Sequence, residues 1–155
     1  FQIRKAKPED TETIFDLIYK LAVYEKLEND VITSVEELRT NIFEKKFAEV
    51  LIAEEDEKPV GFALYFHNFS TFVGKPGIYL EDLFVEPEMR GKGYGKALLI
   101  ELARIAKERN CGRLEWSVLD WNTPSIEFYK SLGAKPMDEW TVFRLDKDGI
   151  ENLAK

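Results

Sequence analysis

The sequence is poor in the residues that build disulfides, metal sites and membrane spans. Its 155 residues include one cysteine, Cys111, and one histidine, His67. A lone thiol forms no internal disulfide, and one histidine with one cysteine is too few for a His/Cys metal site. No apolar run approaches the roughly 18–20 residues that a membrane-spanning helix needs, and the first residues lack the apolar stretch of a signal peptide. We therefore expect a cytoplasmic protein with no metal and no membrane partner.

Glycine and proline are also sparse, at 9 and 6 residues, and no internal repeat or low-complexity tract is present. Hydrophobic residues make up 45% and charged residues 33%, values typical of a globular chain of this length. We expect a single domain spanning residues 1–155. The net charge of −7 disfavours nucleic acid as a partner and is compatible with a cationic one.

The hydrophobic pattern predicts a mixed α/β fold in the order β-α-α-β-β-β-α-β-α-β. Ser34 and Glu37 have the spacing of a capping box, which marks a helix start. Asp56-Glu57-Lys58 separates two strands, with Pro59 closing the turn. The expected strands cover about 2–6, 49–55, 59–67, 77–85, 113–119 and 140–145. The first expected helix runs from an Asp10 cap to about Lys26, the second from Ser34 to about Lys46, and the third from the loop at 90–96 to about Arg109. A fourth begins at a Thr123 cap with Pro124 and ends at Gly133, and a short last helix begins at an Asp148 cap.

A glycine-rich basic loop, Arg90-Gly91-Lys92-Gly93-Tyr94-Gly95-Lys96, lies between an expected strand and helix. Glycines let backbone N–H groups approach a ligand, and a helix start adds free donors, so the loop suits a phosphate or pyrophosphate. A Walker loop would need Ser or Thr where Ala97 stands, and a dinucleotide fingerprint would need glycine at Lys96. What remains is R-x-x-G-x-G, or a strand–helix turn that binds nothing.

The R-x-x-G-x-G pattern resembles the phosphate-binding loop of the GCN5-related N-acetyltransferases (GNAT). The segments 79–85 (YLEDLFV), Asp120-Trp121-Asn122 and Phe128-Tyr129-Lys130 are similar to the diamine acetyltransferase subfamily, which includes spermidine/spermine and thialysine N-acetyltransferases. The resemblance implies the GNAT fold, a mixed central sheet flanked by helices, and acetyl-CoA as cosubstrate. It also implies a homodimer, formed through the C-terminal strand at 140–145.

The same resemblance implies the residues that hold acetyl-CoA. Those for the pyrophosphate are the loop residues Arg90, Gly91, Lys92, Gly93, Tyr94, Gly95 and Lys96. Those for the pantetheine arm are the backbone of Leu83, Phe84 and Val85, together with Asn122, Pro124, Ser125 and Tyr129. From the residues alone, Asn122 and Ser125 could equally be turn or capping residues.

Transfer to an amine requires a proton acceptor, since an ammonium is not a nucleophile, and the leaving thiolate benefits from an acid. Glu81 and Asp82 lie in an apolar strand, where alternation sends them to opposite faces unless the strand bulges. Either could simply pair with a cation. The resemblance assigns Glu81 to substrate binding and to proton removal through water, Asp82 to substrate attraction, and Tyr129 to the general acid. Helical spacing alone would make Tyr129 a core aromatic.

Further substrate contacts are predicted from aromatic and acidic side chains. An aromatic wall and two acids for the distal amine comprise Tyr24, Phe72, Trp121, Trp140, Glu25 and Asp138. Ser70 and Phe72 depart from the spermidine/spermine enzymes, and 118–122 is closer to the thialysine type, so a lysine- or thialysine-like amine is favoured over diamines and polyamines. A protein amine, or a non-catalytic acetyl-CoA-binding regulatory module, remains an alternative. We expect His67 and Cys111 to be structural.

Overall fold

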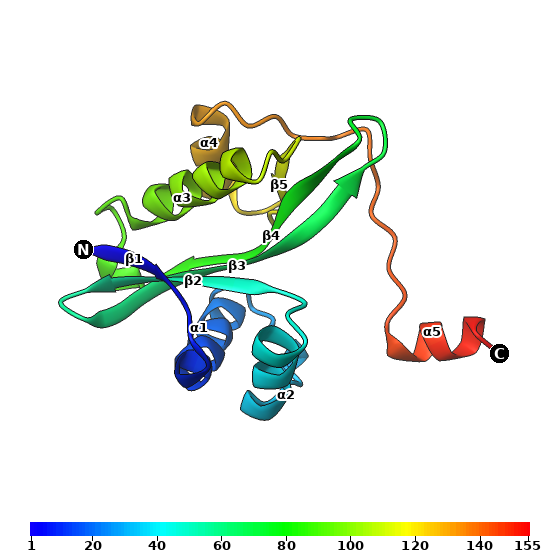
Figure 1. Ribbon diagram of the computed structural model, residues 1–155, viewed down its shortest axis with the longest axis horizontal. Coiled ribbons are helices and arrows are strands. Elements are labelled where there is room, and N and C mark those ends of the chain that lie inside the picture. The colour runs from blue at the N-terminus through cyan, green and yellow to red at the C-terminus, as the bar shows by residue number, and fades with distance from the viewer. The chain divides into compact units, whose positions relative to one another are not determined.

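The strands form one sheet in the order β1-β2-β3-β4-β5, as the computed structural model of residues 1–155 shows (Figure 1). The first four pair antiparallel, and β5 pairs parallel with β4. The predicted mixed sheet is therefore confirmed. The strands are β1 (Gln2–Lys5), β2 (Glu49–Glu55), β3 (Lys58–Ser70), β4 (Lys75–Val85) and β5 (Leu114–Trp116).

The chain divides into two units, Phe1–Ser117 and Val118–Lys155, and the whole sheet lies in the first. Helices cover both faces of this sheet (Figure 1). On one face lie α1 (Thr11–Tyr24) and α2 (Val35–Arg39), the latter continued by a π-helical turn at Thr40–Glu44. On the other lies α3 (Tyr94–Glu108). None of the helices combines the length and the apolar composition needed to cross a membrane.

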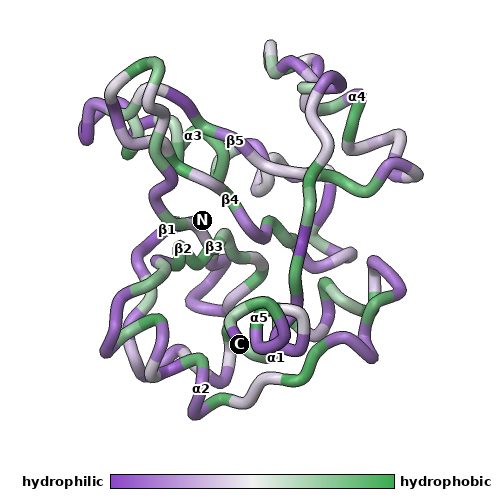
Figure 2. The backbone as a smooth tube through the Cα atoms, turned by 90° about the vertical axis from the view of Figure 1, so that its right-hand side faces the viewer, coloured by the Kyte–Doolittle hydropathy of each residue, from purple (hydrophilic) through white to green (hydrophobic).

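The core between α1 and the sheet follows from the helical spacing of the apolar side chains. Ile14, Leu17 and Leu21 repeat at three- and four-residue intervals and are buried. They pack against alternate residues of the strands, which the hydropathy colouring shows as green segments around β2 and β3 (Figure 2). The shared cluster contains Ile14, Leu17, Leu21, Ile42, Val50, Ile52, Phe62 and Phe84.

The starts of the first two helices show one confirmed prediction and one correction. The Ser34 hydroxyl accepts from the Glu37 N–H at 3.1 Å, as the capping-box spacing predicts. Asp10 stands at the start of α1, but its carboxylate does not cap that helix. It binds both terminal nitrogens of Arg4, at 2.8 and 2.9 Å, because a guanidinium fork offers a stronger, charge-assisted bond.

The hairpin between β2 and β3 turns through Asp56 and Glu57, which both have positive φ. Two such residues make the tight turn that matches strand twist. Pro59 does not close this turn, because it already pairs with Glu54 inside β3.

The second unit contains α4 (Thr123–Ser131) and α5 (Lys147–Leu153). Gly133, at φ +93°, follows the end of α4 as predicted, but α5 is capped by Asp146, whose carboxylate accepts from Gly149 N–H at 2.9 Å, and not by Asp148.

Two strand predictions need correction. The strand expected at 113–119 is only Leu114–Trp116, and 140–145 forms no strand. A strand exists only where a neighbour supplies hydrogen bonds, and the unit provides none for 140–145. The side chains of Trp140, Val142 and Phe143 are exposed.

Candidate functional site

The site begins where β4 leaves its outer neighbour. β5 pairs only with Ile78–Leu80, whereas β3 accompanies β4 as far as Val85. From Glu81 onward, the edge of β4 away from β3 therefore has no strand partner. Backbone groups on such an edge can bond an extended ligand, as predicted for Leu83, Phe84 and Val85.

The glycine loop follows this edge and leads into α3. Gly91 and Gly93 have φ of +82° and +88°, and no atom lies within 4 Å of a Cβ added to either. The first intrahelical bond of α3 runs from Ala97 N–H to Gly93 O, so the preceding N–H groups have no acceptor in the helix. Free donors, open space and the positive end of the helix dipole fit a pyrophosphate at this position.

The basic and aromatic side chains of the loop have partners within the first unit. Tyr94 is 3% exposed, and its hydroxyl donates to Glu55 at 2.5 Å. Burial, then Glu55, raises the pKa of Tyr94 to about 12. Lys92 lies 3.8 Å from the same Glu55 carboxylate, while Lys96 is exposed. Tyr94 can therefore contribute only its backbone to a phosphate, and sequence analysis missed Glu55 as the support of this loop.

The Arg90 side chain is held by contacts with β4 and α1. Its Nε donates to the carbonyl oxygen of Val85 at 3.0 Å. The guanidinium lies 4.6 Å from the ring centroid of Tyr24 and 5.6 Å from that of Phe84. Because Tyr24 is the last residue of α1, the Arg90 side chain connects the loop to that helix.

A β-bulge interrupts β4 at the two predicted carboxylates. The pairing with β3 passes from Tyr65↔Leu80 to Leu64↔Asp82, so Glu81 has no opposite residue. Leu64 packs against the core on the α1 side, and Asp82 shares its face. The extra residue also places Glu81 near enough to raise the pKa of Asp82. The strand therefore bulges at these residues, which is the exception that the sequence analysis allowed, and strict alternation does not apply to them.

A third acid, Glu25, joins this pair from the end of α1. Burial, followed by the charges of Glu81 and Glu25, raises the pKa of Asp82 from 3.8 to about 7. Burial, followed by Glu81, raises the pKa of Glu25. No basic side chain opposes these shifts, so the ion-pair alternative for Asp82 is not supported. We call Glu25, Glu81 and Asp82 the acid cluster; an anionic group of this kind would favour a bound ammonium.

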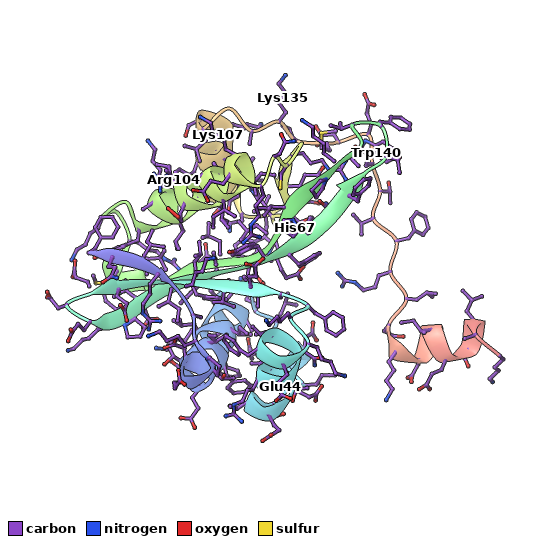
Figure 3. All side chains as sticks on the ribbon, in the orientation of Figure 1. Glu44, His67, Arg104, Lys107, Lys135 and Trp140 are labelled. Atoms are coloured by element: carbon purple, nitrogen blue, oxygen red, sulfur yellow. The ribbon has the colours of Figure 1, made fainter.

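The structure contains no group of three or more His, Cys, Asp or Glu side chains placed to hold a metal ion. His67 lies on the side of β3 that α3 covers (Figure 3), with Nδ1 2.9 Å from Gly77 O and Nε2 3.0 Å from Arg109. Arg109 also binds both oxygens of Glu49 at 2.8 and 2.9 Å. These contacts give His67 a structural role. Sequence analysis missed this network. Its only signal in the sequence is a cation at the end of a helix with a strand after it.

Predicted residues outside the sheet region have mixed outcomes. Phe72, at the tip of the β3–β4 hairpin, is fully exposed, so it packs on no aromatic wall. Asn122 caps α4 by accepting from Ser125 N–H at 3.4 Å, which confirms its capping alternative and replaces Thr123 as the cap. The remaining predicted residues belong to the second unit and their part in the site stays a prediction: Trp121, Pro124, Tyr129, Asp138 and Trp140.

Comparison with known proteins identifies the class. The acetyltransferase (GNAT) family model matches residues 13–134. A thialysine N-epsilon-acetyltransferase from Bos taurus is 40% identical over 164 residues, covering 98% of this chain and 96% of the relative. An L-ornithine N5-acetyltransferase, NATA1, from Arabidopsis thaliana is 28% identical and covers 99% of this chain and 88% of its own.

Among solved structures, an integron cassette protein from the mobile metagenome of V. cholerae is similar, with a TM-score of 0.83 and 31% identity over 99% of this chain and 97% of its own. The fold and the loop thus define an N-acetyltransferase. The chain belongs to the acetyltransferase (GNAT) family, whose members use acetyl-CoA as acetyl donor, so the family and fold expected from the sequence are confirmed.

Proposed function

We propose that this chain transfers the acetyl group of acetyl-CoA to a primary amine of a small cationic substrate, a lysine- or thialysine-like amino acid in the first place and a diamine in the second. The acid cluster carries the proposal, because Glu25, Glu81 and Asp82 gather at the point where β4 opens. The names of the bovine and plant relatives, which both specify an amino acid with a distal amine, support it.

The chemistry requires the bound ammonium to lose a proton before it attacks the thioester. A lysine-like amine has a pKa near ~10.4, so a base must take that proton. Glu81 is exposed at the bulge and can accept it through water, while Asp82, with its pKa near 7, can hold a proton at neutral pH. Unpaired backbone N–H groups along β4 would stabilise the developing oxyanion. Tyr129 of α4 would protonate the departing thiolate.

A thiol-release assay tests the proposal directly. Purified protein and acetyl-CoA are mixed with thialysine, lysine, ornithine, short diamines, spermidine or lysine-containing peptides, and free CoA is measured over time. Release with the small amino acids or diamines supports the proposal. Release only with peptides, or tight acetyl-CoA binding without release under every acceptor, overturns it in favour of a protein acetyltransferase or a binding module.

The role of Glu81 has its own measurement. Glu81→Gln should lower the rate most at acidic pH, where the amine is mostly protonated and a base is most needed. A loss of equal size at every pH would assign Glu81 to substrate positioning.

We also infer a homodimer assembled through the C-terminal segment. The exposed side chains of Trp140, Val142, Phe143 and Leu145 leave an apolar, extended segment without a partner strand in its own unit. A second copy could supply one. Light scattering after gel filtration should give a mass near twice 18.0 kDa, and Trp140→Asp with Val142→Asp should shift it toward the monomer. A monomeric native chain would refute the inference.

A further inference from the structure

Two neighbouring residues at the end of α1 interact with different parts of the site. Tyr24, the last residue of α1, lies under the Arg90 guanidinium at 4.6 Å. Glu25, the next residue, belongs to the acid cluster and interacts with Glu81. The Glu25 N–H bonds the Leu21 carbonyl at 2.9 Å, so both residues are held in the same final helical turn. A displacement of Tyr24 therefore displaces Glu25.

Arg90 is well placed to fix this turn. Besides Tyr24, it contacts Phe84 at 5.6 Å and donates from Nε to the Val85 carbonyl at 3.0 Å. Phe84 is 3% exposed and belongs to the core cluster, so it is a rigid anchor. The guanidinium thus bridges α1 and β4 from the first residue of the phosphate loop.

We propose that Arg90 is a positioning residue, which fastens the phosphate loop to the end of α1 and thereby sets Glu25 beside Glu81 for the amine. The inference rests on the proposed function for its amine readout. It reassigns Arg90, which sequence resemblance places among the pyrophosphate ligands, because its Nε bonds Val85 and its guanidinium lies near the rings of Tyr24 and Phe84. Its effect on Glu25 passes through the final turn of α1, which holds both Tyr24 and Glu25.

The first test separates amine binding from acetyl-CoA binding. Arg90→Lys keeps the charge but loses the flat guanidinium and the Nε donor. It should raise the KM for the amine by about 3- to 10-fold, because one hydrogen bond is lost and an ammonium stacks less well than a guanidinium over Tyr24. The Kd for acetyl-CoA, measured by calorimetry, should change less than about twofold. A rise in the acetyl-CoA Kd with an unchanged amine KM would make Arg90 a phosphate ligand and overturn the proposal.

A double-mutant cycle with Tyr24→Leu identifies the contact. If Arg90 and Tyr24 act through the contact between them, which we call the clasp, the double variant should raise the amine KM no further than the worse single variant. Multiplicative effects would contradict it. Arg104→Lys is the matched control, because Arg104 lies on α3 (Figure 3) and pairs with Glu101 away from the loop. It should change neither constant.

A second measurement needs no turnover, so it distinguishes failure of this inference from failure of the proposed function. The amides of Glu25 and Leu27 bond the carbonyls of Leu21 and Ala22 at 2.9 and 2.8 Å. Loss of the clasp in Arg90→Lys should speed hydrogen–deuterium exchange of residues 24–27 about 3- to 10-fold, with exchange in α3 unchanged. Unchanged exchange at 24–27 would refute the clasp even if no amine were ever acetylated.

Discussion

Replacing Asp82 by asparagine should stabilise the fold at alkaline pH while impairing acetyl transfer. Burial, then Glu81 and Glu25, raises the pKa of Asp82 from 3.8 to about 7. A raised pKa means that the folded state binds the proton more tightly than the unfolded state. This contribution to stability is therefore complete below about pH 3.8 and is lost as the pH rises through 7.

The size of the effect follows from the shift. Three pKa units correspond to roughly 4 kcal/mol at most. The asparagine side chain would still have to bury a polar amide, and Asp82 keeps some exposure to solvent. We therefore expect Asp82→Asn to raise the free energy of unfolding at pH 8 by about 1–3 kcal/mol, or Tm by about 3–8 °C.

Urea unfolding at pH 5 and pH 8 is the assay. As the pH rises from 5 to 8, the free energy of unfolding of the native chain should fall relative to that of Asp82→Asn. The variant should also have a higher KM for the amine. Asp16→Asn is the control, since Asp16 is exposed on α1 and pairs with Lys20 at 3.2 Å. It should change stability by less than about 0.5 kcal/mol with the native pH profile. The reasoning fails if Asp82→Asn is the less stable protein at pH 8, or if the two pH profiles coincide.

Three further predictions concern the acid, the loop and the core network. Tyr129→Phe should lower kcat by about 10²-fold or more while calorimetry finds the acetyl-CoA Kd nearly unchanged, and an unchanged kcat would remove Tyr129 from its role. Gly93→Ala should raise the acetyl-CoA Kd about 5- to 30-fold, because alanine is strained at φ +88°. Gly74→Ala, at φ +74° in the hairpin tip, is the control: it should destabilise the fold by a similar amount and leave the acetyl-CoA Kd unchanged. Because Arg109 lowers the pKa of Glu49, Glu49→Gln should destabilise the fold by about 1 kcal/mol at pH 7 in urea titrations. This difference should shrink as the pH falls below 4.5 and through the lowered pKa, and a difference of the same size at every pH would contradict the ion-pair explanation.

Much of the fold was predictable because local signals and packing agree in this chain. The i, i+3, i+7 spacing of Ile14, Leu17 and Leu21 defines the buried stripe of α1, and Ser34 marks the start of α2. The hydrophobic pattern also predicts a strand at 140–145. Whether it pairs depends on a partner, which neither propensity nor alternation can supply.

For the same reason, only the local part of the site could be predicted from the sequence. The loop at 90–96 is local, so its glycines and helix start could be recognised from sequence. The contacts of its side chains are not local: Glu55 reaches Tyr94 across 39 residues, and Arg90 reaches back to Tyr24. Spacing along a chain carries no information about such pairs, and resemblance had placed Arg90 and Tyr94 with the ligand.

The bulge at Glu81 shows how much a single register shift can decide. In a regular strand, Glu81 and Asp82 would face opposite sides, and each would be a separate polar group in an apolar element. With one residue unpaired, Glu81 lies near enough to act on Asp82, and Glu25 at the end of α1 adds a third carboxylate. Burial, and then like charges nearby, disfavour a charged Asp82 in the folded state, which is why its replacement by asparagine should stabilise the fold. An arrangement that costs stability and is offset when an ammonium binds is the mark of a functional site, so the raised pKa of Asp82 and the proposed binding of a cationic amine have one physical origin.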